Sequence, residues 1–224
     1  MATRERREQD RERRRQDILR AARVVFAQAG FRRATVEEIA RRAEVAKGTI
    51  YLYFDTKEAI LADLVLEALA ELQAQLIAAS DGRPLLHPDD KLRAMADAYL
   101  AFTERAPDYY RLLTAFDGGQ VAANISAERG ELILAASNRT LDLVTQAVAD
   151  GMALGIFPRG NAHHAATVLW AALNGTLALL AHPIRRAMIA TDLHDLYHAT
   201  VELWLKGLSC PDGAPYNPAK EKLL

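Results

Sequence analysis

The chain is poor in cysteine and in long apolar runs, and both shortages exclude classes of protein. Cys210 is the single cysteine among 224 residues, so no disulfide can form within the chain. No run of eighteen apolar residues occurs, and the arginine-rich start is not followed by an apolar segment, which argues against a membrane span and a secretory signal. We therefore expect a cytoplasmic protein with no membrane partner.

Catalytic signatures are also missing. The sequence contains no G-x-S-x-G motif, no phosphate-binding loop and no dinucleotide-binding fingerprint. His194 and His198 are one helical turn apart beside Asp195, and His163 and His164 are adjacent, but H-x-x-x-H lacks the glutamate of the metalloprotease motif. We expect no enzyme, no cofactor and no metal site, although the sequence leaves metal binding by the histidine pair open.

The net charge of −1 is small, but the charge is unevenly distributed. Residues 1–58 contain 15 Lys and Arg against 10 Asp and Glu, and the remainder contains 13 against 19. A basic end suits nucleic acid. Residues 4–15 alternate arginine with acidic residues, so this stretch either extends the first helix or stays a loose arm, and it either touches DNA or is a solvated charged helix end.

Residues 35–57 predict a helix-turn-helix. Thr35 and Glu38 have the spacing of a capping box, and four apolar residues follow at helical spacing on one face: Val36, Ile39, Ala40 and Ala43. The second helix, about 46–53, has only Ile50 and Phe54 as core anchors. A further D-x-x-E cap at Asp55 is expected to begin the next helix.

The polar positions of that second helix fit DNA. Lys47 can donate to phosphate, Gly48 allows close backbone approach, Thr49 can read a base edge, and the hydroxyls of Tyr51 and Tyr53 reach phosphate. Lys57 begins the following helix, where it can reach one more phosphate. The sequence therefore predicts a recognition helix for the major groove.

Three segments together resemble the N-terminal domain of the TetR family of transcriptional regulators: 26–31 (FAQAGF), 35–40 (TVEEIA) and 47–58 (KGTIYLYFDTKE). The similarity covers about residues 16–64. It implies an all-α homodimer that binds a palindromic operator with three N-terminal helices and a small inducer with a divergent C-terminal helical domain. By the same resemblance, the DNA contacts are Thr35, Ala46, Lys47, Gly48, Thr49, Tyr51, Tyr53 and Lys57.

Two residues depart from the family pattern. Glu44 stands where the family most often has glycine, so we expect a left-handed backbone there at a cost of about 1 kcal/mol. Ala46 stands where a hydroxyl residue is usual and therefore gives up a helix cap. An operator sequence or affinity cannot be transferred across these changes.

The expected domains are a charged arm at 1–15, the helix-turn-helix domain at 16–58, a ligand-binding and dimerisation domain at 59–208 and a flexible tail at 209–224. Gly30 ends the first helix. Later helices are expected at about 56–79, 89–104, 107–116, 123–154, 161–181 and 191–208, with no strand. The helix at 56–79 is long enough to join both domains.

Aromatic and aliphatic residues at helical spacing mark the expected ligand pocket, with core packing as the alternative. Asn138 and Asn174 are informative because a buried amide needs a hydrogen-bond partner. The apolar character favours a hydrophobic, aromatic or fatty-acyl inducer. The candidate ligand-binding residues are Tyr99, Phe102, Tyr109, Leu113, Phe116, Leu134, Asn138, Leu141, Trp170 and Asn174.

The last two helices combine small and large apolar residues, a mix that permits close helix approach, and a palindromic operator demands a two-fold protein. The expected dimer interface contains Ala171, Gly175, Ala178, Leu196, Leu203 and Trp204, with packing inside the monomer as the alternative. The sequence favours a repressor released by a small hydrophobic inducer, and it leaves open an activator or an architectural DNA-binding protein without a ligand.

Overall fold

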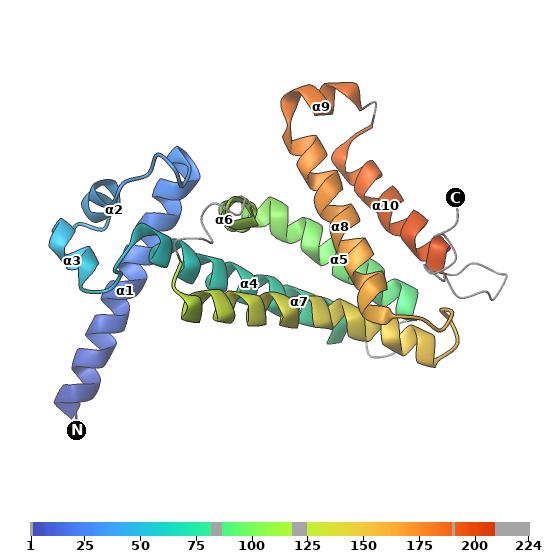
Figure 1. Cartoon of the computed structure of the whole chain (residues 1–224), viewed down its shortest axis with the longest axis horizontal. Coiled ribbons are helices and arrows are strands. Elements are labelled where there is room, and N and C mark those ends of the chain that lie inside the picture. Colours follow the sequence, from blue (N-terminus) through green and yellow to red (C-terminus); the bar gives the residue numbers. More distant parts are fainter. Residues whose placement is uncertain (1, 82–86, 118–124, 190, 209–224) are drawn as a thin grey trace. The chain divides into compact units, whose positions relative to one another are not determined.

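The computed structural model describes residues 2–81, 87–117, 125–189 and 191–208. These residues form helices joined by turns, without a strand in the described ranges (Figure 1). The helices are α1 (Ala2–Ala29), α2 (Val36–Arg42), α3 (Lys47–Tyr51), α4 (Lys57–Asp81), α5 (Pro88–Arg105), α6 (Pro107–Asp117), α7 (Ala127–Ala153), α8 (Ala162–Ala181), α9 (Pro183–Met188) and α10 (Leu193–Leu208). The predicted all-α class is confirmed.

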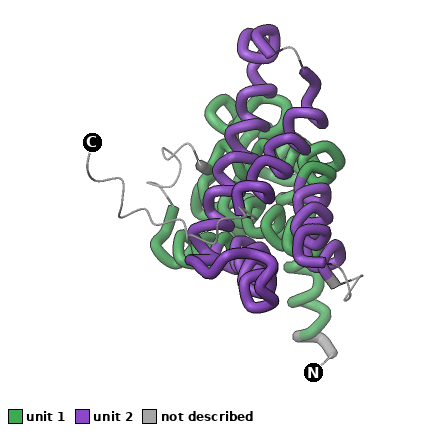
Figure 2. The backbone as a smooth tube through the Cα atoms, turned by 90° about the vertical axis from the view of Figure 1, so that its right-hand side faces the viewer, with its two compact units in different colours: residues 1–74, 100–137 green, residues 75–99, 138–224 purple. Residues whose placement is uncertain are grey.

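The helices group into two compact units, which are coloured separately in Figure 2. The first unit contains residues 1–74 and 100–137, and the second contains residues 75–99 and 138–224. The helix-turn-helix therefore shares its unit with α6 and the beginning of α7, beyond the expected boundary at residue 58. The helices α4, α5 and α7 each have residues in both units.

The core of the first unit is built from the apolar faces of α1 to α4, with contributions from α6 and α7. Ile18, Ile39, Ile50 and Ile60 have no exposed surface. Leu112 of α6 is also buried there. Burial of apolar area is the main stabilising contribution to such a core, and here it fixes the helix-turn-helix on α1 and α4.

An acidic side chain of α4 joins two other helices inside the first unit. Asp63, whose side chain is 10% exposed, accepts from Arg15 of α1 at 2.7 Å and from Arg129 of α7 at 3.2 Å. One turn further along α4, burial raises the pKa of Glu67, which lies near Arg15 and Arg23 of α1. These contacts position α1 against α4 and α7.

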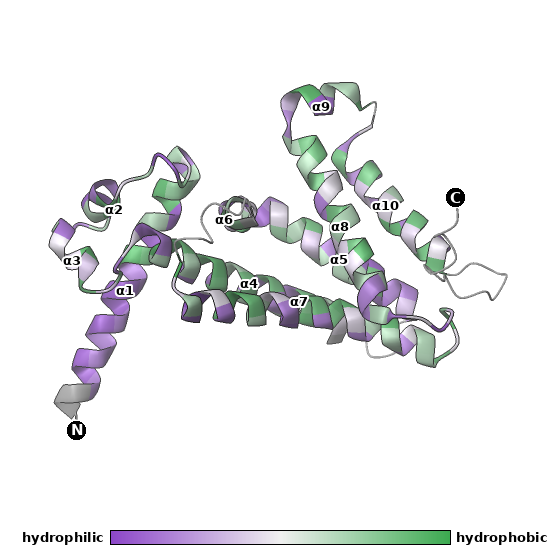
Figure 3. Cartoon of the chain, in the orientation of Figure 1, coloured by the Kyte–Doolittle hydropathy of each residue, from purple (hydrophilic) through white to green (hydrophobic). Residues whose placement is uncertain are grey.

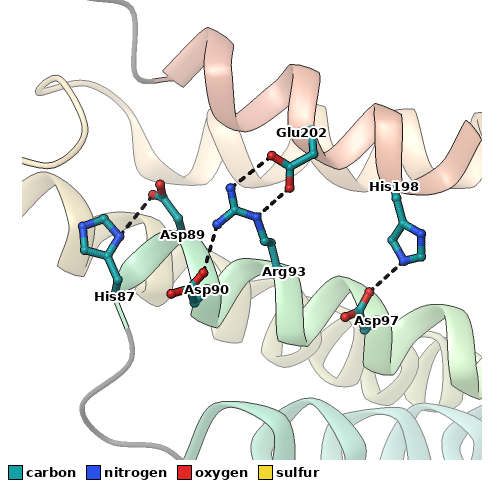
Figure 4. Close-up of polar contacts among 7 residues, drawn as sticks. All are labelled: His87, Asp89, Asp90, Arg93, Asp97, His198 and Glu202. Carbon is teal, nitrogen blue, oxygen red and sulfur yellow. Dashed lines mark hydrogen bonds and ion pairs between the residues drawn. The ribbon is translucent and has the colours of Figure 1, made fainter. Parts of the chain in front are cut away.

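In the second unit, polar contacts hold α10 to α5 (Figure 4). The Arg93 guanidinium donates to both carboxylate oxygens of Glu202, at 2.6 and 3.1 Å, and this keeps the pKa of Glu202 below its ordinary value. His198 lies 3.0 Å from Asp97. The hydroxyl of the fully buried Tyr197 donates to the Ala96 carbonyl at 2.8 Å.

The beginning of the chain is helical. Of the two alternatives for residues 4–15, the structure shows the extended helix, because α1 runs without interruption from Ala2. The predicted end of this helix is confirmed, since Gly30 has a φ of 75° and donates its N–H to the Phe26 carbonyl at 2.9 Å.

Two local expectations were wrong. The cap of α4 is Thr56, whose hydroxyl accepts from the Ala59 N–H at 3.0 Å, and not Asp55. A separate helix, α9, follows the break at His182 with Pro183 in its first turn, a position that proline favours. The predicted helix start at residue 123, the tail at 209–224 and Cys210 lie outside the described residues.

The buried side of α7 does not include two of the predicted ligand-binding residues, Leu134 and Asn138. Ile133, Ala136 and Val148 are buried, whereas Leu134 is 62% exposed and Asn138 is exposed. The exposed Asn138 amide can be hydrated by water and does not require a partner inside the protein.

By length and composition, α8 is apolar enough to cross a membrane. Its apolar character is visible in Figure 3. Six of its residues are buried in the second unit, and a single helix that passes by length and composition alone is weak evidence. The helix therefore gives no evidence for a membrane.

Candidate nucleic-acid interface

The helix-turn-helix is fixed by its own backbone and caps. The Thr35 hydroxyl accepts from the Glu38 N–H at 3.2 Å and the Glu38 carboxylate accepts from the Thr35 N–H at 3.0 Å, which confirms the capping box. Glu44, in the turn, has a φ of 56°, so the expected left-handed conformation is confirmed in a non-glycine residue. This turn sets the direction of α3.

The helix α3 places most of its surface in solvent. Lys47, Gly48 and Tyr51 are exposed, while Ile50 is fully buried and anchors the helix. Ala46 is the N-cap and makes no side-chain cap bond, as expected. Unsatisfied N–H groups at a helix start are suited to an anion. A helix of five residues is not an anion site by itself, but it exposes the side chains of Lys47 and Tyr51 to solvent.

Nothing in the fold requires glycine at position 48. A Cβ atom at this position would meet nothing within 4 Å, and its φ is not positive. The free fold therefore has room for any side chain there. The missing side chain on the exposed face of α3 leaves room for another surface to approach the backbone.

Lys47 forms an ion pair with Glu37 of α2 in the free protein. The hydrogen bond from Lys47 lowers the pKa of Glu37, and Glu37 raises the pKa of Lys47. Both side chains are exposed. Lys47 is therefore held at the surface by a carboxylate of the neighbouring helix.

The remaining predicted contacts lie around α3. Tyr53 follows α3 in a turn and is half-buried, and Thr49 is half-buried on α3. The Lys57 ammonium donates to the carbonyls of Phe31 and Ala34 at 2.8 and 2.9 Å and lies 4.4 Å from the Phe31 ring centroid. Lys57 thus has a structural role that the sequence did not indicate.

Two further residues lie at this face: Leu52, which the sequence analysis missed, and Arg11, which belongs to the charged stretch 4–15 whose contact with DNA was left open. Leu52 is 72% exposed directly after α3, and a large exposed apolar side chain beside four polar positions could have been noticed. The Arg11 guanidinium of α1 lies 5.9 Å from the Tyr53 ring centroid. No local sequence signal connects Arg11 with Tyr53, because 42 positions separate them.

The predicted ligand-binding residues are divided between the two units. Phe102, Tyr109, Leu113, Phe116 and Leu134 belong to the first unit, and Tyr99, Asn138, Leu141, Trp170 and Asn174 belong to the second. Phe102 is fully buried, and Tyr109, Leu113 and Phe116 pack against the first core. Trp170, like Leu134 and Asn138, is exposed.

Two members of this set bind each other. The Tyr99 hydroxyl donates to Asn174 Oδ1 at 2.9 Å, and Asn174 Nδ2 donates to the Trp170 carbonyl at 2.9 Å. The partners of the Asn174 amide are therefore a tyrosine and its own helix backbone. This pair joins α5 to α8 within the second unit.

Most of the predicted dimer residues are exposed on α8 and α10. Four of them are exposed: Ala171, Gly175, Ala178 and Leu203, the last with 69% of its surface exposed. Ala171 and Ala178 face solvent on α8, and Gly175 lies between them on the same helix. Leu196 is half-buried, and the half-buried Trp204 donates its indole N–H to the Ala165 carbonyl at 3.2 Å. Trp204 thus packs inside its own chain, whereas the small residues of α8 are available to a partner.

The part of the chain that the structure describes contains no group of three or more acidic, histidine or cysteine side chains arranged to hold a metal.

Two family models match the chain. Residues 18–64 match the model of the bacterial regulatory proteins of the tetR family, and residues 92–204 match the tetracyclin repressor-like C-terminal domain. Together these matches cover the helix-turn-helix and most of the helices that follow it.

Curated relatives match over part of their length. The fatty acid metabolism regulator protein of Bacillus subtilis (strain 168) is 46% identical over 54 residues, which is 24% of this chain and 28% of the relative. The HTH-type transcriptional activator FasR of Mycolicibacterium smegmatis is 33% identical over 122 residues, 51% of this chain and 53% of the relative. The matched region thus spans about half or less of the length of these relatives.

Solved structures share the fold over nearly the whole chain. A tetR-family regulatory protein from Rhodococcus RHA1 has a TM-score of 0.70 at 23% identity, covering 89% of this chain and 98% of that one. FadR from Bacillus subtilis, in complex with stearoyl-CoA, has a TM-score of 0.67 at 22% identity, covering 86% and 98%. Proteins of this type are DNA-binding regulators and not enzymes. With both of its domain models matched, the chain belongs to the TetR family of transcriptional regulators.

Proposed function

We propose that this chain is a ligand-responsive repressor that binds a palindromic operator as a homodimer in the cytoplasm and is released by a small hydrophobic inducer. The observation that carries the proposal is α3, a helix anchored by the buried Ile50 that presents Lys47, Gly48 and Tyr51 to solvent. A helix with this distribution of buried and polar positions is suited to the major groove.

The contacts divide by their chemistry. Lys47, Tyr51 and Tyr53 bind phosphate, and Thr49 reads a base edge or a thymine methyl group. Gly48 brings the backbone of α3 close to the DNA. Thr35, Ala46 and Lys57 lie at the starts of α2, α3 and α4, where the first-turn N–H groups that the caps do not use can meet phosphate. Because two N–H groups of Lys57 serve carbonyls, its third is the one available to DNA.

The exposed face of α8 and α10 supports a homodimer. Ala171, Gly175 and Ala178 follow one another at helical spacing, and Leu203 stands exposed on α10. Small residues let two helices approach closely, and a leucine beside them supplies apolar area to bury. A two-fold dimer then presents two recognition helices to two half-sites, about one DNA turn apart.

The inducer is proposed to be a fatty-acyl or aromatic compound. The second unit has a largely apolar interior, and its Tyr99–Asn174 pair supplies a hydroxyl and an amide for a polar group of such a ligand. The solved FadR with the same fold holds stearoyl-CoA. Because α4 has residues in both units, ligand-dependent movement of α4 changes the spacing of the recognition helices so that the operator no longer fits.

A second candidate function is activation of transcription. FasR of Mycolicibacterium smegmatis, a relative over about half of each chain, is described as an activator. Activation needs the same operator contacts at a different promoter position. An architectural DNA-binding protein without a ligand is the remaining alternative, and a second unit that binds no small molecule would favour it.

The proposal is tested by fluorescence anisotropy on a duplex selected by the purified protein from random DNA. Lys47→Ala is expected to weaken binding to all sequences and to reduce the salt slope by about 0.9 per half-site, whereas Thr49→Val is expected to change the preferred base. Glu37→Gln is the control, because it removes the free-state partner of Lys47 without removing a phosphate contact. Unchanged binding by both Lys47→Ala and Thr49→Val would refute the assignment.

The ligand part is tested separately with long-chain acyl-CoA as the probe. Micromolar stearoyl-CoA is expected to release the protein from the operator, and octanoyl-CoA and free CoA serve as controls for chain length and headgroup. If none of these compounds changes operator binding or the melting temperature, the acyl proposal is wrong, and an aromatic inducer becomes the compound class to screen.

A further inference from the structure

The N-terminal half of α1 extends beyond the core of the first unit. Its residues 5–14 are exposed, and burial begins at Ile18. Figure 1 shows this end of the helix projecting past α2 and α3, and Figure 3 shows that it is hydrophilic. Two or three turns of charged helix contribute no core, so their role has to come from their surface.

The side of α1 that packs against the core continues into a basic face. At 100° per residue, Arg7, Arg11 and Arg15 lie on the same side of the helix as the buried Ile18 and Ala22. Each step of four residues advances about 6 Å along the helix. The face that holds the helix-turn-helix at one end therefore carries guanidinium groups at the other.

The contacts of this face join it to the recognition helix region. Arg15 binds Asp63 and lies 5.6 Å from the Phe54 ring centroid. One turn toward the N-terminus, Arg11 lies 5.9 Å from the ring centroid of Tyr53, a residue that we assign to a phosphate contact. Arg7 follows one further turn out.

Neighbouring carboxylates form no ion pair with Arg7 or Arg11 in the described part of the chain. Asp10 binds Arg13 at 3.1 Å, and Glu12 binds Arg15 at 3.2 Å and Gln16 at 3.0 Å. Among the described residues, Arg7 and Arg11 form no ion pair. Arg13 lies on the opposite side of the helix. The carboxylates of Asp10 and Glu12 are thus engaged by Arg13 and Arg15, and the guanidinium groups of Arg7 and Arg11 remain available to an anion.

We propose that Arg7 and Arg11 form a second DNA-contacting surface, which binds backbone phosphates next to those bound by the recognition helix. DNA is the occupant that fits, because the face is basic, adjoins Tyr53 and has no apolar side chain that a protein partner would need. The contact gives affinity and no base preference. This inference rests on the proposed operator binding.

The test compares two double variants with the same change in charge. Arg7→Ala with Arg11→Ala removes the basic face, and Arg6→Ala with Arg13→Ala removes two arginines from the opposite side of the same helix. Alanine favours the helix in every case, and circular dichroism checks that helix content is unchanged.

The first readout is the salt dependence of operator binding. Loss of two phosphate contacts per half-site is expected to reduce the slope of log K against log salt by about 1.8 per half-site. Between 50 and 200 mM salt, binding weakens by about 3.5-fold for each phosphate contact. A variant that lacks the contact loses that factor from its salt dependence. The Arg6/Arg13 control is expected to keep the wild-type slope to within about 0.5.

The second readout is phosphate ethylation interference on the operator. Wild type is expected to be blocked by ethylation at one or two phosphates per half-site that no longer matter to the Arg7/Arg11 variant, while interference at the Lys47 phosphates persists. Equal slopes and equal interference patterns in both variants, with Lys47→Ala still weakening binding, would overturn this inference alone. A wild-type protein that binds no duplex would overturn the proposed function as well.

Discussion

Replacing Asp63 by asparagine tests how the helix-turn-helix is held to the rest of its unit. The Asp63 carboxylate is 10% exposed and receives Arg15 at 2.7 Å and Arg129 at 3.2 Å, whose side chains are 33% and 27% exposed. The asparagine of this variant would keep one acceptor oxygen but would present an amide donor to a guanidinium. Arg15 keeps Glu12 as a second partner at 3.2 Å, so Arg129 is the arginine that loses its charge compensation in a partly buried position.

The expected loss in the free energy of unfolding lies between two limits. Breaking a buried ion pair by removing one partner costs about 3–5 kcal/mol, and an exposed pair contributes about 0–1 kcal/mol. With a buried acid and two arginines that retain some solvent, we expect a loss of about 2–3 kcal/mol. For a chain of this length, 1 kcal/mol corresponds to about 2–4 °C in melting temperature, so Asp63→Asn should melt roughly 5–10 °C lower.

The assay is thermal unfolding followed by circular dichroism, with Asp17→Asn as the matched control. Asp17 also pairs with two arginines, Arg14 and Arg20, but all of these side chains are at least 32% exposed. The control is expected to change stability by no more than about 0.5 kcal/mol. If Asp63→Asn has the same melting temperature as the control, the buried carboxylate does not stabilise the packing of the three helices, and the reasoning fails.

Three further substitutions test other parts of the structure. Lys57→Met should lower stability by about 2 kcal/mol, because it leaves two carbonyls without a charged donor, and an unchanged melting temperature would show those bonds to be dispensable. Gly151→Ala should cost about 1–3 kcal/mol, because its Cβ would lie 2.3 Å from the Phe157 ring; chemical denaturation measures this, and a neutral result would refute the close packing. Glu202→Gln should lose about 0.5–1 kcal/mol at neutral pH but little in strong acid. The reason is that Arg93 lowers the pKa of Glu202, so the stabilisation is complete above the ordinary value of 4.5 and is lost as pH falls through the folded pKa; a pH-independent difference would contradict it.

Local signals in the sequence were sufficient for the DNA-binding region. Thr35 and Glu38 satisfy each other three residues apart, and Gly30 supplies the left-handed residue that ends α1. Such signals depend on neighbours along the chain, so a sequence reveals them directly. The helix α9 was missed because Pro183 fits both a break and a first helical turn.

Contacts between distant helices could not be predicted. Arg15 and Asp63 are 48 residues apart, and Arg93 and Glu202 are 109 apart, so no spacing rule connects them. The α7 helix shows a related limit. Apolar residues occur at both Ile133 and Leu134, and periodicity alone could not decide which side of the helix is buried. The exposed Leu134 was therefore included among the predicted ligand-binding residues.

The central claim, a two-fold regulator reading DNA with α3, is tested most directly by selecting binding sites from random duplex DNA with the purified chain. We expect enrichment of a palindrome whose half-sites are about one helical turn apart, bound by an even number of protomers with salt-sensitive affinity. Enrichment of no sequence, or of a single unrepeated half-site bound by one protomer, would contradict it.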